Sequence, residues 1–190
     1  GEVRDGDELI ALIATHMAER GELGGGVAVT VMSNYGFHGA MRDAGIDVAT
    51  TPVGDRHVAA ELARRDWALG GEQSGHVIWK GFAPTGDGIA ASLLATRALG
   101  GRPLADAIPM RKLPQRLVNI EISDRGAVEG AAGLWAEVER ESAALEGRGR
   151  VLVRASGTED LLRVMVEAPD HQECDSVCER LAAVVRTELA

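Results

Sequence analysis

The stretch Val27-Ala28-Val29-Thr30-Val31-Met32 decides the fold class of this sequence. It is apolar almost throughout and does not alternate with polar residues, which is typical of a strand covered on both faces in a parallel sheet. A helix is predicted before it, over about 7–20 with Asp7 as its N-cap, and a second strand is predicted over 46–50. Helices and strands that alternate over short connections predict a layered α/β domain.

The same alternation continues up to residue 104. The elements predicted in this part are a helix over 37–44, a helix over 57–65, a short strand at 68–69 and a helix over 88–99. Gly45, Pro52 and Gly54 punctuate the connections, as turn residues do. We therefore expect a first, α/β domain over residues 1–104.

A second pattern follows a stretch rich in proline and basic residues, and we place the domain boundary between residues 104 and 105. The predicted elements are a strand over 117–122, a helix over 127–145, strands over 151–154 and 162–166, and a helix over 171–188. The loop between the last two strands is too short for a crossover helix, so these strands should pair antiparallel. Leu134, Trp135 and Val138 should lie on the buried face of the first helix. Residues 105–190 are therefore expected to form a small α+β domain with an antiparallel sheet and two helices.

Composition and charge exclude several classes of protein. Acidic residues outnumber basic residues by 29 to 20, and the net charge of −9 would repel nucleic acid and anionic membranes. No apolar run reaches the roughly 18 residues of a membrane span, and the first residues lack the layout of a signal peptide, so we expect a cytoplasmic protein without membrane contact. His171, Cys174 and Cys178 share one face of a predicted helix. Buried thiols of this kind more often pack than bind metal, and we expect no metal site in this chain.

The most informative segment is Arg154-Ala155-Ser156-Gly157-Thr158-Glu159-Asp160-Leu161-Leu162-Arg163. In the predicted hairpin, Arg154 and Arg163 meet next to the connecting loop, where two cations repel each other across the strands. A bound dianion would remove this repulsion, and the planar guanidinium suits phosphate because it donates two hydrogen bonds at once.

The residues between the two arginines add to this interpretation. Ser156 and Thr158 supply hydroxyl donors, and Gly157 allows backbone N–H groups to approach an oxyanion. The alternative is a hairpin whose arginines pair with Glu159 and Asp160. Residue types alone leave both interpretations open.

A second candidate is the loop Gly70-Gly71-Glu72-Gln73-Ser74-Gly75-His76 at a strand end in the first domain. Glu72 and Ser74 can point the same way, and a carboxylate beside a hydroxyl suits the hydroxyls of a sugar. His76 could orient a substrate or move a proton near neutral pH. The alternative is an ordinary turn with a solvated carboxylate and a structural histidine.

Two more loops lead into predicted helices. Thr51-Pro52-Val53-Gly54-Asp55-Arg56 follows a strand, and Thr85-Gly86-Asp87-Gly88 opens the helix over 88–99. Asp55 and Asp87 are expected first as helix caps, while Arg56 could face a substrate.

Taken in order along the chain, these four motifs resemble those of the α-D-phosphohexomutase family, in the bacterial branch that acts on glucosamine phosphate. The resemblance covers nearly the whole chain. Members of the family have four domains, and this chain is similar to the third, a βα-layered domain with a mixed sheet, and the fourth, a small TBP-like α+β domain.

The resemblance implies a role for each candidate residue. The implied sugar-binding residues are Gly54, Asp55, Arg56, Glu72 and Ser74, and the implied phosphate-binding residues are Arg154, Ser156, Gly157, Thr158 and Arg163. His76 would be an acid, a base or an anchor. The implied reaction interconverts glucosamine 6-phosphate and glucosamine 1-phosphate through a phosphoserine and a bisphosphate. The nucleophilic serine would lie in domains missing from this chain, so the chain alone should be inactive.

The resemblance also implies cofactors and partners. The cofactors are Mg²⁺, held by the missing second domain, and a glucose or glucosamine bisphosphate as activator or intermediate. The partners are a hexosamine phosphate and the N-terminal domains of the same enzyme. Whether the enzyme forms a homodimer is left open. Two other functions also stay open: part of a mutase for mannose or glucose phosphates, and a sugar-phosphate-binding module without chemistry.

Overall fold

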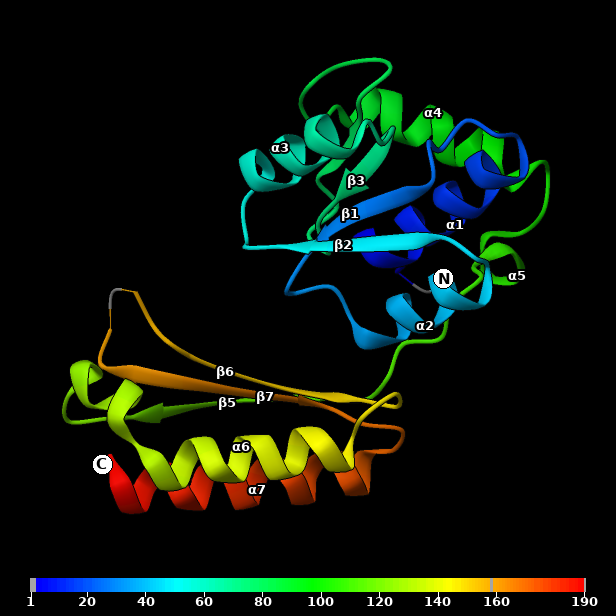
Figure 1. Cartoon of the computed structure of the whole chain (residues 1–190). Coiled ribbons are helices and arrows are strands. Elements are labelled where there is room, and N and C mark those ends of the chain that lie inside the picture. The colour runs from blue at the N-terminus through cyan, green and yellow to red at the C-terminus, as the bar shows by residue number, and fades with distance from the viewer. Residues whose placement is uncertain (1–2, 158, 190) are drawn as a thin grey trace. The chain divides into compact units, whose positions relative to one another are not determined.

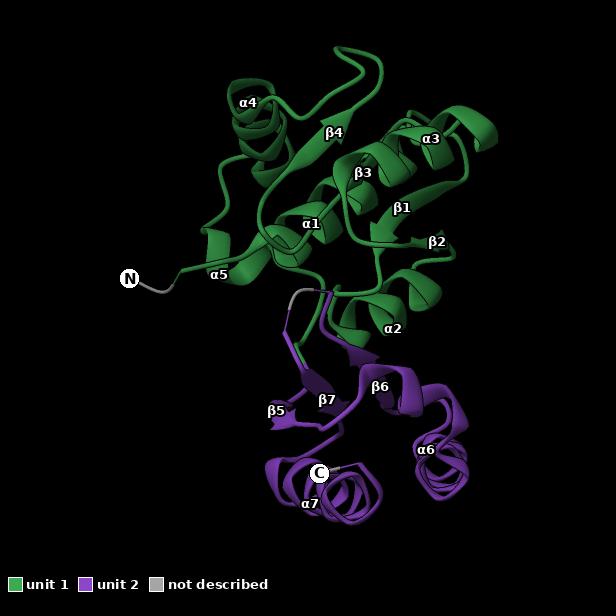
Figure 2. Ribbon diagram, turned by 90° about the vertical axis from the view of Figure 1, so that its left-hand side faces the viewer, with its two compact units in different colours: residues 1–112 green, residues 113–190 purple. Residues whose placement is uncertain are grey.

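A computed structural model describes residues 3–157 and 159–189. The chain divides into two compact units, Gly1–Lys112 and Leu113–Ala190 (Figure 2). The boundary expected after residue 104 therefore lies later, after Lys112. The reason is that residues beyond 104 still pack on the first unit: Ala107 is buried beside Leu12 and Ala98, and Lys112 forms an ion pair with Asp5.

Unit 1 is a layered α/β structure around a mixed sheet (Figure 1). Its helices are α1 (Gly6–Glu19), α2 (Tyr35–Asp43), α3 (Asp55–Arg65), α4 (Gly88–Leu99) and α5 (Leu104–Ala107), and its strands are β1 (Gly26–Thr30), β2 (Asp47–Thr51), β3 (Leu69–Gly71) and β4 (Val77–Trp79). The strand order is β2-β1-β3-β4; β1 pairs in parallel with β2 and β3, and β4 runs antiparallel to β3. The expected α/β domain with a mixed sheet is confirmed, although β4 had not been predicted.

The core of unit 1 lies on both faces of this sheet. Val27 and Val29 pack into a cluster with α1, α2 and α4, while Ala28 packs on the other face against Val58 and Leu62 of α3. Because every residue of β1 is buried, the strand shows no polar alternation, as expected for a strand covered on both sides.

The start of α1 differs from the prediction. Asp5 is the N-cap, and it forms a capping box with Glu8. Asp7, the expected cap, instead lies inside the helix and is fully buried. Asp5 and Asp7 both fit the sequence pattern of an N-cap. Asp7 is instead buried against the turn before α2, where its carboxylate accepts a hydrogen bond from Asn34 N–H, so Asp5 is left as the cap.

Unit 2 is a three-stranded antiparallel sheet with two helices on one face (Figure 1). Its elements are β5 (Gln115–Glu121), the 3₁₀ turn η1 (Arg125–Gly130), α6 (Ala132–Ala144), β6 (Arg150–Ala155), β7 (Leu161–Glu167) and α7 (His171–Glu188). The strand order is β5-β7-β6, so β6 and β7 form the predicted antiparallel hairpin. The expected α+β architecture is confirmed.

The helix expected over 127–145 is broken into η1 and α6. The Trp135 side chain, expected on the buried face, is 38% exposed and donates from Nε1 to the carbonyl of Val128 at 2.8 Å. At the start of α6, Leu134 N–H donates to Glu188 Oε2 of α7 at 3.0 Å. A carboxylate from another helix therefore caps α6, since Ala131 at the N-cap has no side-chain oxygen.

No helix in the described ranges has both the length and the apolar character needed to cross a membrane.

We predict that Gly70→Ala destabilises unit 1 by about 1–3 kcal/mol, as is typical of overpacking a core. A Cβ at Gly70 would lie 2.6 Å from the carbonyl oxygen of Ala28 and 2.7 Å from Val58 Cγ1. Gly88→Ala is the matched control, because no atom lies within 4 Å of its Cβ position. Urea denaturation followed by tryptophan fluorescence should separate the two variants, and equal midpoints would contradict the packing argument.

Candidate functional site

The candidate site of unit 1 lies at the carboxyl edge of its parallel strands. β1, β2 and β3 end at Thr30, Thr51 and Gly71, so the loops that follow them leave from the same edge. A hollow of about 500 Å³ opens there. It is lined by Asp5, Thr30, Met32, Val53, Glu72, Gln73 and Ser74. This edge is where open α/β sheets bind their ligands.

Hydrogen bonds within the loop and to α1 fix the loop that carries Glu72. Glu72 N–H donates to the carbonyl of His76 at 3.0 Å, and Gly75 N–H donates to the carbonyl of Glu72 at 2.9 Å. Gly75 has a φ of +95°, which favours glycine. Gly6, at the start of α1, donates to the carbonyl of Gln73 at 2.9 Å. The first turn of α1 therefore braces this loop.

The Glu72 carboxylate joins two of the predicted loops. Its Oε1 accepts from Gly54 N–H at 3.0 Å, and the side chain is half-buried rather than an exposed, solvated carboxylate. Gly54 has a φ of +122° and is the N-cap of α3, so glycine is required at this turn. Ser74 is exposed and borders the same hollow as Glu72.

His76 joins the other loops. Its Nε2 lies 3.5 Å from Asp55 Oδ2. Against its ring lies the backbone of Gly86, where a Cβ would be 2.4 Å from Nε2. Asp55 occupies the first turn of α3 instead of the N-cap, whereas Asp87 caps α4 as predicted, accepting from Ile89 and Ala90.

Arg56 is not brought to this group. Its side chain is exposed, and its Nε donates to Nε2 of His57 at 3.2 Å. The structure therefore brings together Gly54, Asp55, Glu72 and His76, and it places Ser74 beside them at the hollow.

A buried acid lies behind this edge. The Asp7 carboxylate accepts from Asn34 N–H at 2.8 Å, and its side chain is inaccessible to solvent. Burial raises the pKa of the Asp7 carboxyl from 3.8 to about 6, although the hydrogen bonds from Asn34 and Ser33 act in the opposite direction. Asp7 thus fixes the turn that leads from β1 into α2.

The candidate site of unit 2 is a row of polar side chains across its sheet. Arg154 of β6 lies directly opposite Arg163 of β7, and Asn119 of β5 lies opposite Arg163 on the other side. Residues directly opposite in an antiparallel sheet share a face, and Val118 and Val164 on the alternate face pack toward the helices. The three polar residues therefore occupy the face that carries no helix. The register of the two arginines is as predicted, and Asn119 was missed because it lies outside the motif.

The loop that joins β6 and β7 is closed by its own hydrogen bonds. Ser156 is buried, its N–H donates to the carbonyl of Leu161 at 2.8 Å, and its Oγ accepts from Glu159 N–H at 3.3 Å. Gly157 is exposed. Thr158, also predicted as a phosphate ligand, lies outside the described residues.

The charges around this loop are only partly paired. Arg163 Nη2 lies 3.8 Å from Glu159 Oε2, and Arg163 Nε is buried without a hydrogen-bond acceptor in the described ranges. Asp160 pairs with Arg125 at 3.1 Å. The alternative in which Glu159 and Asp160 pair with the two motif arginines therefore holds only for the long contact between Glu159 and Arg163.

Metal ligation is not supported at the residues considered from the sequence. Within residues 3–157 and 159–189, no three histidine, cysteine, aspartate or glutamate side chains gather as metal ligands. Cys174 and Cys178 are buried, and burial raises the pKa of the Cys178 thiol to about 11. A protonated thiol is a poor metal ligand.

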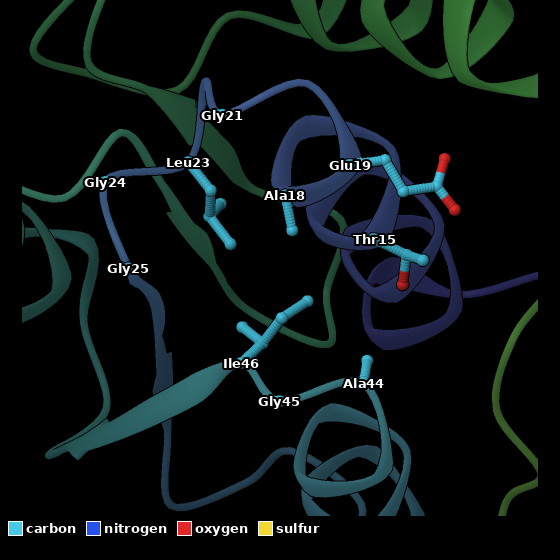
Figure 3. A pocket seen from close by; sticks show the side chains of 10 residues that line it. All are labelled: Thr15, Ala18, Glu19, Gly21, Leu23, Gly24, Gly25, Ala44, Gly45 and Ile46. Atoms are coloured by element: carbon cyan, nitrogen blue, oxygen red, sulfur yellow. The ribbon is translucent and has the colours of Figure 1, made fainter.

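A larger hollow of about 610 Å³ lies at the opposite, amino edge of the sheet (Figure 3). Its walls come from the end of α1, the turn before β1 and the turn before β2. Glu19 is the single charged side chain that lines it. The larger hollow therefore offers little polar chemistry, and the smaller one at the carboxyl edge is the better candidate.

A mixed-sheet α/β unit followed by a small antiparallel α+β unit defines the class: an α/β protein with the architecture of phosphohexomutase domains III and IV. The chain belongs to the phosphoglucomutase/phosphomannomutase family. The model of the alpha/beta/alpha domain III of that family matches residues 5–112, and the model of its C-terminal domain matches residues 117–184.

Relatives and solved structures agree with this membership. Over its whole length, the chain is 53% identical to a phosphoglucosamine mutase of Parafrankia sp. (strain EAN1pec), and it spans 41% of that protein. Over 97% of its length, the chain is 46% identical to a phosphoglucosamine mutase of Mycobacterium marinum, and it spans 42% of that protein. It is also similar in fold to Aspergillus fumigatus N-acetylphosphoglucosamine mutase in complex with GlcNAc-6P and magnesium. That match has a TM-score of 0.78 and 22% identity, and covers 95% of this chain and 46% of the other.

We predict that Asp7 makes the stability of unit 1 depend on pH. Its pKa is higher in the folded state than its ordinary 3.8, so the folded state loses stability as pH rises from about 4 to about 6. The full loss would be about 3 kcal/mol. Asp7→Asn keeps an acceptor for Asn34 N–H but cannot ionise, so its stability advantage over the wild type should grow across this range.

Urea denaturation at several pH values between 4 and 7 measures this difference. Asp43→Asn, at an exposed carboxylate of α2, is the control and should track the wild type. Parallel pH profiles for the wild type and Asp7→Asn would show that Asp7 does not titrate in this range.

Proposed function

We propose that this chain is the sugar- and phosphate-binding part of a mutase that interconverts glucosamine 6-phosphate and glucosamine 1-phosphate. The observation that carries the proposal is the position of Arg154 directly opposite Arg163, beside the loop of Ser156 and Gly157. Two cations on one face of a sheet favour a dianionic ligand. The identity of about half to proteins named phosphoglucosamine mutase supports glucosamine phosphate as the substrate.

In the proposed reaction, a phosphoserine outside this chain gives its phosphoryl group to a sugar hydroxyl. The bisphosphate that forms returns its other phosphoryl group to the serine, so the phosphate of the sugar has changed position without net hydrolysis. Transfers of this kind depend mainly on positioning and electrostatics. We therefore expect this chain to bind substrate and to turn over none by itself.

Unit 1 would hold the sugar. Glu72 and Ser74 border the carboxyl-edge hollow, where a carboxylate can accept hydrogen bonds from sugar hydroxyls and a serine can both donate and accept. The hydrogen bond from Gly54 to Glu72 orients that carboxylate. His76, held between Asp55 and Gly86, would anchor the substrate or exchange a proton with it.

Unit 2 would hold the phosphate that is not reacting. Arg154 is exposed and can form a bidentate contact, and the buried Nε of Arg163 donates no hydrogen bond in the described part of the chain. Ser156, Gly157 and Thr158 complete the proposed phosphate loop. Mg²⁺ would neutralise charge on the transferred phosphoryl group, but the described residues of this chain do not fit a metal site, and no role here depends on it.

Two alternatives follow from the same sites. The family description includes phosphoglucomutase and phosphomannomutase, so glucose or mannose phosphates are competing substrates. The other alternative is a binding module without chemistry. Calorimetric titration of this chain with glucosamine 6-phosphate, glucose 6-phosphate, mannose 6-phosphate and inorganic phosphate ranks the ligands, and coupled assays of the longer protein that contains this chain test turnover.

We predict that Arg154→Ala weakens the binding of inorganic phosphate to this chain by about 10- to 100-fold, the value of a lost charge-assisted contact. Arg116→Ala is the matched control, since Arg116 lies on the same sheet and pairs with Asp175 at the surface. Calorimetry with inorganic phosphate gives both affinities. Equal affinities for the two variants would remove Arg154 from the site.

We predict that Glu72→Gln weakens the binding of glucosamine 6-phosphate about tenfold, as for a hydrogen bond to a charged group, and leaves the binding of inorganic phosphate unchanged. Glutamine can still accept from Gly54 N–H, so the melting temperature should hold. Glu19→Gln, at the opposite edge of the sheet, is the control. A fall in melting temperature without a change in sugar binding would assign Glu72 a structural role only.

A further inference from the structure

We propose that Arg125 is a positioning residue for the phosphate loop between Arg154 and Arg163, an inference that rests on the proposed phosphate-binding function of unit 2. Arg125 lies outside the motif that suggested the loop, at the start of the 3₁₀ turn η1. It acts through the loop backbone, and the phosphate contacts themselves come from the motif residues.

The Arg125 guanidinium holds the loop at three points. Its Nη1 donates to the carbonyl of Gly157 at 3.2 Å and to the carbonyl of Ser156 at 3.5 Å, while its Nε pairs with Asp160 Oδ1 at 3.1 Å. A planar guanidinium can satisfy several acceptors in a fixed geometry, which lysine cannot do. One side chain therefore joins both ends of the loop turn.

The contacts of Arg125 with the loop carbonyls determine which backbone groups of the loop can face a bound anion. In a trans peptide the C=O of one residue and the N–H of the next point in opposite directions, and no peptide among the described residues is cis. With the Ser156 carbonyl turned to Arg125, the N–H of Gly157 points to the opposite side. An anion there would meet a donor rather than a carbonyl oxygen, which would repel it.

The backbone that carries Arg125 is itself fixed. Asp124 Oδ1 accepts from Gly126 N–H at 2.8 Å, and Ile122 N–H donates to the carbonyl of Asp160 at 3.0 Å. Ser123 N–H donates to the carbonyl of Leu189 at 2.8 Å. Arg125 thus projects from a braced segment, as a group that preorganises a binding loop must.

The test is binding of inorganic phosphate to the chain and to three variants by calorimetry, with ¹H–¹⁵N NMR of the loop amides. Arg125→Ala should weaken binding about five- to tenfold through lost preorganisation, and the amides of Gly157 and Glu159 should exchange faster with solvent. Arg125→Lys keeps the positive charge but lacks the planar guanidinium, so it should also bind phosphate more weakly than the wild type. Arg116→Ala, which also removes one cation from unit 2, should bind like the wild type.

Asp160→Asn separates positioning from charge. Removal of a negative charge beside a phosphate site should strengthen binding if charge alone matters, whereas loss of the hold on Arg125 should weaken it. Stronger binding by Asp160→Asn, full recovery in Arg125→Lys, or unchanged binding in Arg125→Ala would each overturn the inference while leaving the phosphate site in place. No phosphate binding by the wild-type chain would overturn the proposed function of unit 2 and this inference with it.

Discussion

The burial of β1 on both faces is the constraint on which unit 1 depends. Val27 and Val29 pack on one face with residues of α1, α2 and α4, and Ala28 packs on the other face with residues of α3. The strand therefore takes the middle of the sheet, with a parallel neighbour on each side. Because parallel strands end at the same edge of the sheet, the loops that follow them lie close together. Loops far apart in sequence can therefore make contacts such as the hydrogen bond between Gly54 and Glu72.

Unit 2 obtains its site from the opposite kind of pairing. Its antiparallel register is fixed by the apolar face under α6 and α7, because a slip of one residue would turn Val164 away from the helices. The same register forces Arg154 and Arg163 into one row. Packing on one face of the sheet thus maintains a concentration of positive charge on the other, although the whole sequence is acidic.

The sequence was most informative where the signal is local and repeated. The periodic spacing of apolar residues predicted the α/β unit and the α+β unit, and glycines with charged neighbours indicated the loops at the candidate sites. The misses have two kinds of cause. The break before α6 depends on a distant carboxylate, Glu188, whereas β4 has only three residues, too few to show a period. The contacts of Glu72 with Gly54 and of Arg125 with its loop join separate segments, so neither could be read from one motif.

Glu188 also bears on where unit 2 can be shortened. The model of the C-terminal domain of the family matches this unit only up to residue 184, yet Glu188 accepts a hydrogen bond from Leu134 N–H, and the carbonyl of Leu189 accepts one from Ser123 N–H. A protein trimmed to the matched region would leave the first turn of α6 without its acceptor and would loosen the segment that ends in Arg125. The last turn of α7 therefore belongs to the minimal folding unit, even though it lies beyond the residues that the domain model matches.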